Sequence, residues 1–191
     1  MSSLAELSTL RTKIRALIED KNFTDFEVFT YTNSSIFTLA EENINEITKV
    51  LKNGSELGSG DYTYDSTTNK ITITASLSSN DTIEVDYTYY KYSDTELDEY
   101  MRASLVWLSV FDENSKDYEI EEIGIYPTPE NRTLDLICLI SSILIKPDWT
   151  QYRMPNVTVI YQNNMSKETK IERLINRFTF SSGVNDILEF D

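Results

Sequence analysis

Carboxylates are the most numerous ionisable side chains in this chain. Its 191 residues include 32 Asp and Glu, 17 Lys and Arg, and no histidine. The lack of histidine excludes Ser-His-Asp and Cys-His catalysis and the commonest zinc and iron ligand sets. Two carboxylates could still form a glycosidase pair, but the sequence singles out no particular pair. We therefore expect no catalytic residue and no enzyme activity.

Three further patterns could bind a metal or a phosphate group. Asp61, Asp65 and Asn69 recur every four residues, but a calcium loop needs closer ligands and a bidentate Glu, so turn chemistry explains them better. The glycines of residues 53–60 lack the Lys-Ser/Thr of a phosphate-binding loop and suit hairpin turns. Cys138, the only cysteine, lies in an apolar run and is expected to be buried. No metal and no cofactor are predicted.

A cluster of tyrosines is a candidate binding surface. Residues 86–92 read Asp-Tyr-Thr-Tyr-Tyr-Lys-Tyr, so Tyr87 and Tyr89 could stack on a sugar or contact a protein. Cross-strand packing on one face of a sheet is the alternative that we favour.

The segment that carries these tyrosines reads as an all-β module. Apolar residues alternate with polar ones from Lys70 to Tyr89, and Asn53-Gly54 is a hairpin signal. An aromatic, β-branched strand is expected at residues 23–31. The pattern predicts a half-buried antiparallel sheet, curled into a small barrel or a sandwich.

Helical periodicity brackets this module. A first helix is expected over Leu4–Ile18, with Ser3 and Glu6 as a capping box. A second starts at Ser93 or Asp94 and carries two apolar stripes, which are Leu97, Met101, Leu105 and Leu108, and Tyr100, Ala103, Trp107 and Val110. The second stripe could contact another helix of the chain or a partner subunit, so Tyr100 and Trp107 are candidate oligomer-interface residues.

The C-terminal part adds two more helices and an apolar tail. Residues 130–145 should form a helix buried on all sides that Pro147 stops, and Ser166 should open a last helix to about Phe178. An extended segment is expected at residues 156–161 between them. Apolar residues around the end of the chain either pack on their own domain or dock on a partner, and these are Phe178, Phe180, Val184, Ile187, Leu188 and Phe190.

Together these elements predict an α+β fold. We expect a bundle of about four helices, formed by residues 1–22 and 93–191 with a C-terminal arm. Residues 23–92 are expected to form an antiparallel β-sheet or small β-barrel inserted between the first and second helices.

Charge and composition restrict the partners and the location. The formal net charge of −15 argues against non-specific duplex binding, which depends on Lys and Arg. The start of the chain lacks a signal-peptide pattern, and its longest apolar run, about a dozen residues, is shorter than the roughly 20 that span a bilayer. We expect a soluble protein made in a reducing cytoplasm, with no membrane partner.

The helical segments resemble the head–tail adaptor (connector) proteins of tailed phages. The resemblance covers Leu4–Ile18, the Glu96–Phe111 helix after a Ser-Asp-Thr-Glu start, the apolar Leu134–Ile145 helix, and the last helix with its tail. Residues 50–90, with Lys-Asn-Gly, Asp-Tyr-Thr-Tyr and Asp-Thr-Ile-Glu-Val-Asp-Tyr, are similar to β-modules of phage tail and fibre proteins. A β-insertion of this size is absent from the minimal adaptor.

The resemblance implies a virion protein made in the host cytoplasm and placed at the head–tail neck. It implies a homo-oligomeric ring, commonly a dodecamer, beneath the portal protein. A head-completion, stopper or tail-terminator protein would lie next to it, and DNA would pass without specific binding. The alternative hypothesis is a tail or fibre accessory protein whose tyrosine-rich β-module binds a glycan or a host surface.

Overall fold

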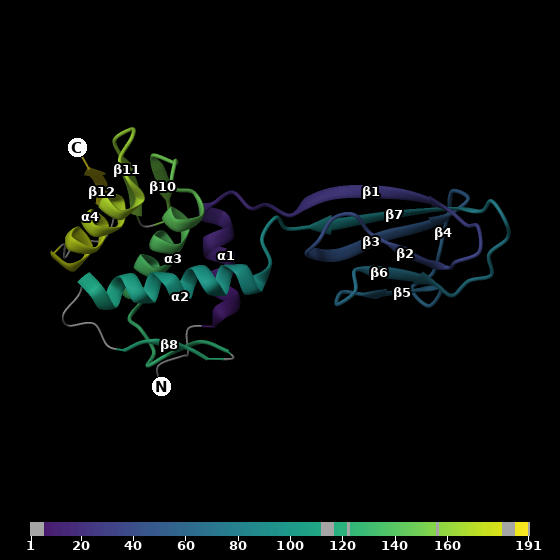
Figure 1. Cartoon of the computed structure of the whole chain (residues 1–191), viewed down its shortest axis with the longest axis horizontal. Helices are drawn as coiled ribbons and strands as arrows, with labels where there is room; N and C mark the ends of the chain where they lie inside the picture. The colour runs from purple at the N-terminus through teal and green to yellow at the C-terminus, as the bar shows by residue number, and fades with distance from the viewer. Residues whose placement is uncertain (1–5, 112–116, 122, 156, 181–185, 191) are drawn as a thin grey trace. The chain divides into compact units, whose positions relative to one another are not determined.

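The chain divides into two compact units. The first consists of Met1–Asp20 and Asp94–Asp191, and the second is Lys21–Ser93. The computed structural model (Figure 1) describes residues 6–111, 117–121, 123–155, 157–180 and 186–190, with side chains described up to residue 178. As the sequence predicted, the fold is mixed α and β, with four helices and several small sheets in the described residues.

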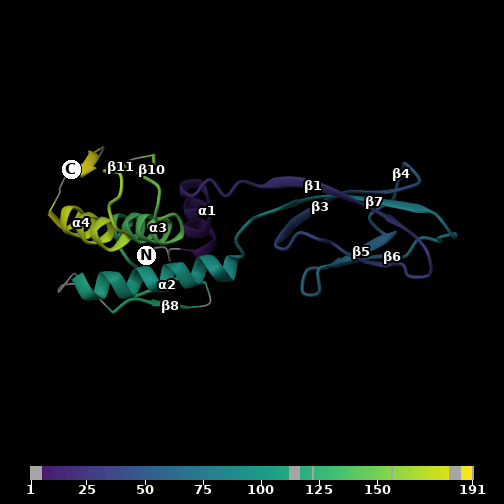
Figure 2. The same cartoon turned by 45° about the horizontal axis from the view of Figure 1, so that its top comes forward.

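The second unit, Lys21–Ser93, consists of two antiparallel sheets that share one core (Figure 2). The first sheet has the order β1–β7–β3–β4, with β1 at Phe23–Thr30, β7 at Thr82–Tyr89, β3 at Ile44–Lys52 and β4 at Ser55–Glu56. The second has the order β2–β6–β5, with β2 at Ile36–Thr38, β6 at Lys70–Ile73 and β5 at Tyr62–Asp65. Buried residues from both sheets fill the space between them, namely Phe37, Leu39, Val50, Ile71, Ile73, Ile83, Val85 and Tyr87.

Period-two alternation produces this core. In β7, Ile83, Val85 and Tyr87 are fully buried, while Glu84 and Asp86 between them remain partly exposed. Successive side chains of a strand point to opposite faces, so one face of β7 is apolar and packs on the second sheet. The predicted alternation is confirmed from Thr82 to Tyr87, whereas Thr88, expected on the polar face, is buried as well.

The Asn53-Gly54 hairpin is also confirmed. Lys52 pairs with Ser55 across the turn, and Asn53 and Gly54 adopt φ values of 51° and 79°. A two-residue hairpin turn that matches the twist of its strands needs positive φ at both positions, which Asn and Gly tolerate best.

The inserted unit is a sandwich of two open sheets. Among the described residues, β1 and β4 end the first sheet and β2 and β5 end the second, and no pairing joins one sheet to the other. The strands therefore form no closed barrel, although the sequence allowed one.

The first unit is organised around one central helix. It contains α1 (Leu7–Leu17), α2 (Asp94–Phe111), α3 (Asn131–Ile145) and α4 (Lys167–Phe180), and α3 contacts each of the other three. Nine residues of α3 are buried, among them Ser141 and Ser142, whose hydroxyls donate to Ile137 O and Cys138 O. The prediction of a helix buried on all sides is thus confirmed. None of the described helices is both long and apolar enough to cross a membrane.

The first helix begins later than the sequence predicted. Glu6 occupies the N-cap of α1, and its side chain makes no capping hydrogen bond. Glu6 therefore precedes the helix and cannot be the third residue of a capping box, and the other half of that prediction, Ser3, lies outside the described residues.

Small sheets complete the first unit. β8 (Glu119–Ile120) and β9 (Ile125–Tyr126) form a hairpin. β10 (Gln151–Arg153) pairs antiparallel with β11 (Val157–Tyr161), which fits the predicted extended segment, and β12 (Asp186–Phe190) pairs with β11 in parallel. The backbone of the C-terminal segment thus extends a sheet of its own chain.

An ion-pair cluster joins α1 to the start of α2. The guanidinium of Arg11 donates to both carboxylate oxygens of Asp98, at 2.8 and 2.6 Å, and to Asp94 at 3.0 Å. Arg15 donates to Asp94 at 3.0 Å and also to Asp20. The hydrogen bond to Asp98 raises the pKa of Arg11 above its ordinary value. The cluster thus links Asp20, where the chain leaves the helical unit, to Asp94, where it re-enters that unit.

Candidate interaction surfaces

The exposed face of α2 carries apolar side chains. Val106 and Val110 are 63% and 67% exposed, and Phe111 beside them is also exposed. Trp107 is half-buried and stacks on Phe111, with ring centroids 5.5 Å apart and planes 5° from parallel. We call Val106, Trp107, Val110 and Phe111 the α2 surface.

The predicted interface residues of α2 are only partly available. Tyr100 and Trp107 are both half-buried, whereas the stripe Leu97, Met101, Leu105 and Leu108 is buried within the first unit. The sequence reading missed Val106 and Phe111, although the spacing of Val106 to Val110 and of Trp107 to Phe111 is the i, i+4 signal of one helix face.

A cavity of about 560 Å³ lies beside the α2 surface. Its lining combines α2 with the segment around β8 and consists of Arg102, Leu105, Val106, Ser109, Asp117, Tyr118, Glu119 and Ile120. Ile123 and Tyr126 of the same hairpin region are exposed as well. Apolar side chains bordered by Arg and carboxylates are typical of a protein contact with a polar rim.

Of the predicted C-terminal docking residues, only Phe178 has a described side chain. Phe178 is buried, and the guanidinium of Arg132 lies 5.5 Å from its ring centroid. Phe180 lies in α4, whereas Ile187, Leu188 and Phe190 lie in β12, and their side chains are not described. Val184 lies outside the described residues.

The predicted tyrosine patch is part of the sandwich core. Tyr87 is fully buried, and its hydroxyl donates to Glu27 Oε1 at 2.7 Å. Burial and the Glu27 carboxylate raise the pKa of Tyr87 well above its ordinary value. Tyr89 is partly buried against the ring of Phe23, at 5.7 Å. Cross-strand packing therefore accounts for both residues, and Tyr87 cannot stack on a sugar.

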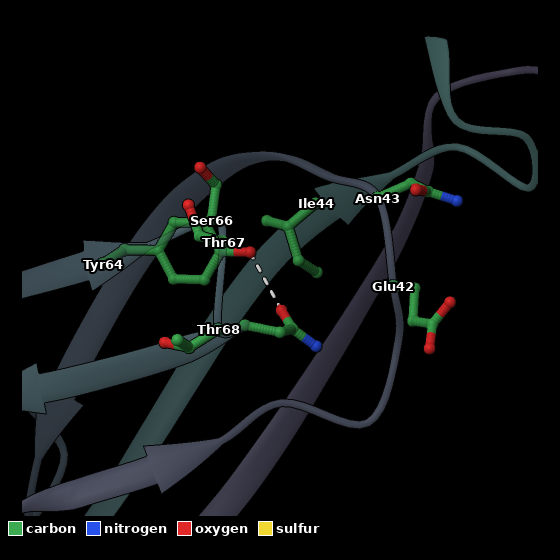
Figure 3. A pocket seen from close by; sticks show the side chains of 8 residues that line it. Glu42, Asn43, Ile44, Tyr64, Ser66, Thr67 and Thr68 are labelled. Atoms are coloured by element: carbon green, nitrogen blue, oxygen red, sulfur yellow. Dashed lines mark hydrogen bonds between the residues drawn. The ribbon is translucent and has the colours of Figure 1, made fainter. Parts of the chain in front are cut away.

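A different tyrosine lines a polar cavity of about 410 Å³ on the inserted unit (Figure 3). The Tyr64 hydroxyl donates to Asn69 Oδ1 at 2.9 Å, and the Asn69 amide donates at 2.8 Å to the carbonyl oxygens of Leu39 and Glu41. Burial and the nearby Asp65 raise the pKa of Tyr64. The lining comprises Glu42, Asn43, Ile44, Tyr64, Ser66, Thr67, Thr68 and Asn69.

The carboxylates that resembled a calcium pattern support turns. Asp61 accepts a hydrogen bond from Gly58 N, and Asp65 accepts from Thr67 N and the Thr68 hydroxyl. The Thr68 bond, with that of Thr67, lowers the pKa of Asp65. In the described part of the chain, no three Cys, Asp or Glu side chains lie close enough together to hold a metal ion.

Two buried reactive groups are held by packing. Cys138 is fully buried in α3, and burial raises the pKa of its thiol to about 12. Lys170 is buried in α4, and its ammonium donates to the carbonyl oxygens of Pro147 and, at 2.9 Å, of Trp149. Burial lowers the pKa of Lys170. These carbonyls follow the end of α3, so Lys170 joins α4 to that end.

No family model matches this sequence, and no curated protein is significantly similar to it.

Proposed function

We propose that this chain is a non-enzymatic structural protein of a tailed-phage virion, a head–tail adaptor that forms a ring under the portal and joins capsid to tail. The proposal rests on the resemblance of the helical segments to adaptors. It is supported by a four-helix unit that carries a β-module after its first helix.

The main support for the proposed ring is the exposed α2 surface. A helix of a lone subunit normally turns one apolar stripe to the core, and α2 does so with Leu97, Met101 and Leu108. Val106 and Val110 add a second apolar area that faces solvent. Contiguous exposed apolar area of this kind marks protein contacts. In the proposed ring, the α2 surface, which includes Trp107, packs on the neighbouring copy, and half-buried Tyr100 lies at its margin.

The remaining partners follow from the proposed position in the virion. The portal protein lies on one side of the ring, and a head-completion, stopper or tail-terminator protein lies on the other. The C-terminal residues Phe180 to Phe190 are proposed to contact one of these partners through side chains, while the β12 backbone stays paired with β11. The net charge of −15 suits a channel wall that lets DNA pass without binding it.

The oligomeric state of the purified protein tests this proposal. Mass photometry and negative-stain electron microscopy should show rings. Val110→Lys should weaken each contact about tenfold, because desolvating a charge replaces burial of a valine worth about 1.5 kcal/mol. Asn176→Lys, which adds the same charge at an exposed site of α4, is the matched control and should assemble normally.

Two results would contradict the adaptor assignment. One is a Val110→Lys protein that assembles like wild type. The other is immunogold labelling of intact particles that places the protein in tail fibres, away from the neck.

The polar cavity at Tyr64 favours one second candidate, glycan binding by a tail or fibre accessory protein. An aromatic ring beside hydroxyl and amide groups matches the mixed apolar and polar faces of a sugar. Glycan-array screening should then find a ligand that Thr67→Lys abolishes. Thr63→Lys, an exposed change on β5, should leave binding intact. An array with no bound glycan would rule this candidate out.

A further inference from the structure

The strand β1 forms a long open edge of the inserted unit. It is eight residues long and pairs with β7 without any shift in register, whereas the pairing of β3 with β7 is interrupted twice. In the part of the chain that the structure describes, no strand pairs with the other side of β1. Proline, lysine and bulges, which commonly protect an edge from pairing, are missing from Phe23–Thr30, and its charged residues are Asp25 and Glu27.

The backbone groups that face this open edge can be identified. Tyr31 N donates to Asp81 O at 2.8 Å, so residue 31 points its backbone toward the β7 side. Because direction alternates along an antiparallel strand, the backbone of Thr24, Phe26, Val28 and Thr30 points away from β7. The amide of Phe26 is consistent with this direction, because it donates to Asp25 Oδ1, a side-chain atom of its own strand, at 2.8 Å.

The same four residues present their side chains to solvent. Phe26 is 61% exposed and Val28 is 57% exposed, and Thr24 and Thr30 flank them as exposed β-formers. An edge whose backbone pairs with no strand and that carries aromatic and β-branched side chains is suited to strand addition.

We propose that β1 pairs antiparallel with β1 of a second copy, about a two-fold axis that passes through Glu27. We choose a second copy as the partner because the residue types on the open edge are nearly symmetric about Glu27. In this register Phe26 lies opposite Val28 of the second copy, and Thr24 lies opposite Thr30. Each aromatic residue then meets a β-branched one, and each threonine meets a threonine, which are favourable cross-strand pairs. A two-fold contact repeats each pair and closes after two copies.

The Asp25 hydrogen bond and the negative charge of each copy both oppose this pairing. Asp25 must release the Phe26 amide to the second copy. The Glu27 carboxylate, which would meet its own copy at the axis, is turned inward, where Oε1 accepts from Ala40 N at 2.8 Å and from the Tyr87 hydroxyl at 2.7 Å. Each copy also carries a formal charge of −15. Salt screens this repulsion, so the dimer should become tighter as salt rises.

Sedimentation velocity over a concentration series tests the contact on the full chain. In the Val110→Lys background, where the proposed ring contact is weakened, the protein should dimerise through β1, and adding Val28→Lys should raise the dissociation constant about tenfold, since two cross-strand apolar pairs are lost. Ile36→Lys is the matched control, because Ile36 is 51% exposed on β2 of the same unit. A Val110→Lys protein that stays monomeric throughout, or equal effects of Val28→Lys and Ile36→Lys in that background, would overturn the proposal.

Disulfide trapping tests the register independently of stability. A Thr24→Cys protein mixed with a Thr30→Cys protein should form mixed disulfide dimers faster than either forms with itself. The native Cys138 is fully buried and does not compete. Equal rates for all three combinations would overturn the register.

This pairing does not rest on the adaptor function. The same trapping in the Val110→Lys background separates the two contacts. Crosslinks that persist there support the β1 contact whether or not rings form. Crosslinks that vanish there would show that they depend on the α2 surface, and would overturn β1 as an autonomous contact.

Discussion

Asp81 shows how one side chain organises a turn of the sandwich. Its carboxylate accepts hydrogen bonds from Ser78 N at 2.7 Å and from the Asn53 amide at 2.8 Å, and it lies 3.1 Å from the Lys52 ammonium. These partners, the backbone bond first, lower its pKa from 3.8 to about 2. One carboxylate thereby joins the turn before β7 to the hairpin of β3 and β4.

The lowered pKa gives a pH-dependent prediction. A carboxyl group that is more acidic in the folded state than in the unfolded state adds stability above the unfolded pKa. For Asp81 this stability is present above pH 3.8 and is lost as pH falls toward about 2. Asp81→Asn should therefore reduce the loss of thermal stability between these two values, measured by far-UV circular dichroism.

A matched carboxylate provides the control for Asp81. Glu56→Gln changes an exposed residue of β4 in the same sheet and should keep the wild-type acid profile. Equal acid profiles for Asp81→Asn and wild type would show that the hydrogen bonds of Asp81 do not contribute.

At the scale of elements, a part-buried ion pair joins α1 to α2. The bidentate Arg11–Asp98 contact joins side chains that are only 22% and 17% exposed. Charge-assisted, bidentate hydrogen bonds of this kind are stronger than those between exposed ions. Lys13 and Asp135 form the comparable link between α1 and α3, through a single 2.9 Å bond with Lys13 41% exposed.

The two ion pairs differ enough to be tested against each other. Arg11→Met should destabilise the helical unit by roughly 1–3 kcal/mol, because Asp98 loses the donor of both its hydrogen bonds while Asp94 keeps only Arg15. Lys13→Met removes a single hydrogen bond from a more exposed ammonium, 41% against 22% for Arg11, and should cost at most about 1 kcal/mol. Urea unfolding followed by tryptophan fluorescence reports on this unit, since Trp107 and Trp149 both lie in it. Equal losses for the two variants would refute this ranking.

At the scale of the whole molecule, the β-module is inserted at a point that the fold accommodates. Phe23 at the start of β1 pairs with Tyr89 at the end of β7, so the module begins and ends on neighbouring strands. On the helical side, Arg15 binds both Asp20 and Asp94, the residues that flank the insertion. Each unit has its own buried core, as an inserted domain requires.

Residues 21–93 should therefore fold without the helices. A polypeptide of this range should give a β-type circular dichroism spectrum and cooperative thermal unfolding. Its Ile83→Asp variant, with a charge at a fully buried site, should be unfolded and serves as the control. A wild-type fragment without dispersed amide signals in its NMR spectrum would show that the module depends on the helical unit.

Local signals located most elements from sequence alone. Alternation from Lys70 to Tyr89 identified β6 and β7, and period-three-and-four spacing identified α2 and α3. These predictions succeed because residues that share one buried face of a strand or helix recur every two or 3.6 residues along the chain. Asparagine is a second local signal, because it is common where the backbone turns with positive φ. Five of the six described non-glycine residues with positive φ are Asn, which tolerates that conformation better than most residues.

By itself, then, the amino-acid order determined the four helices, the longer strands of the β-module and the acidic character of the protein. Only the tertiary structure decided that Tyr87 is buried on Glu27, that β12 pairs with β11, and that the strands form two open sheets. Only it showed that Val106 and Phe111 are exposed on α2, and that β1 has a free edge. Periodicity is a property of neighbours along the chain, whereas pairing and exposure depend on residues that are distant in sequence and meet only after folding.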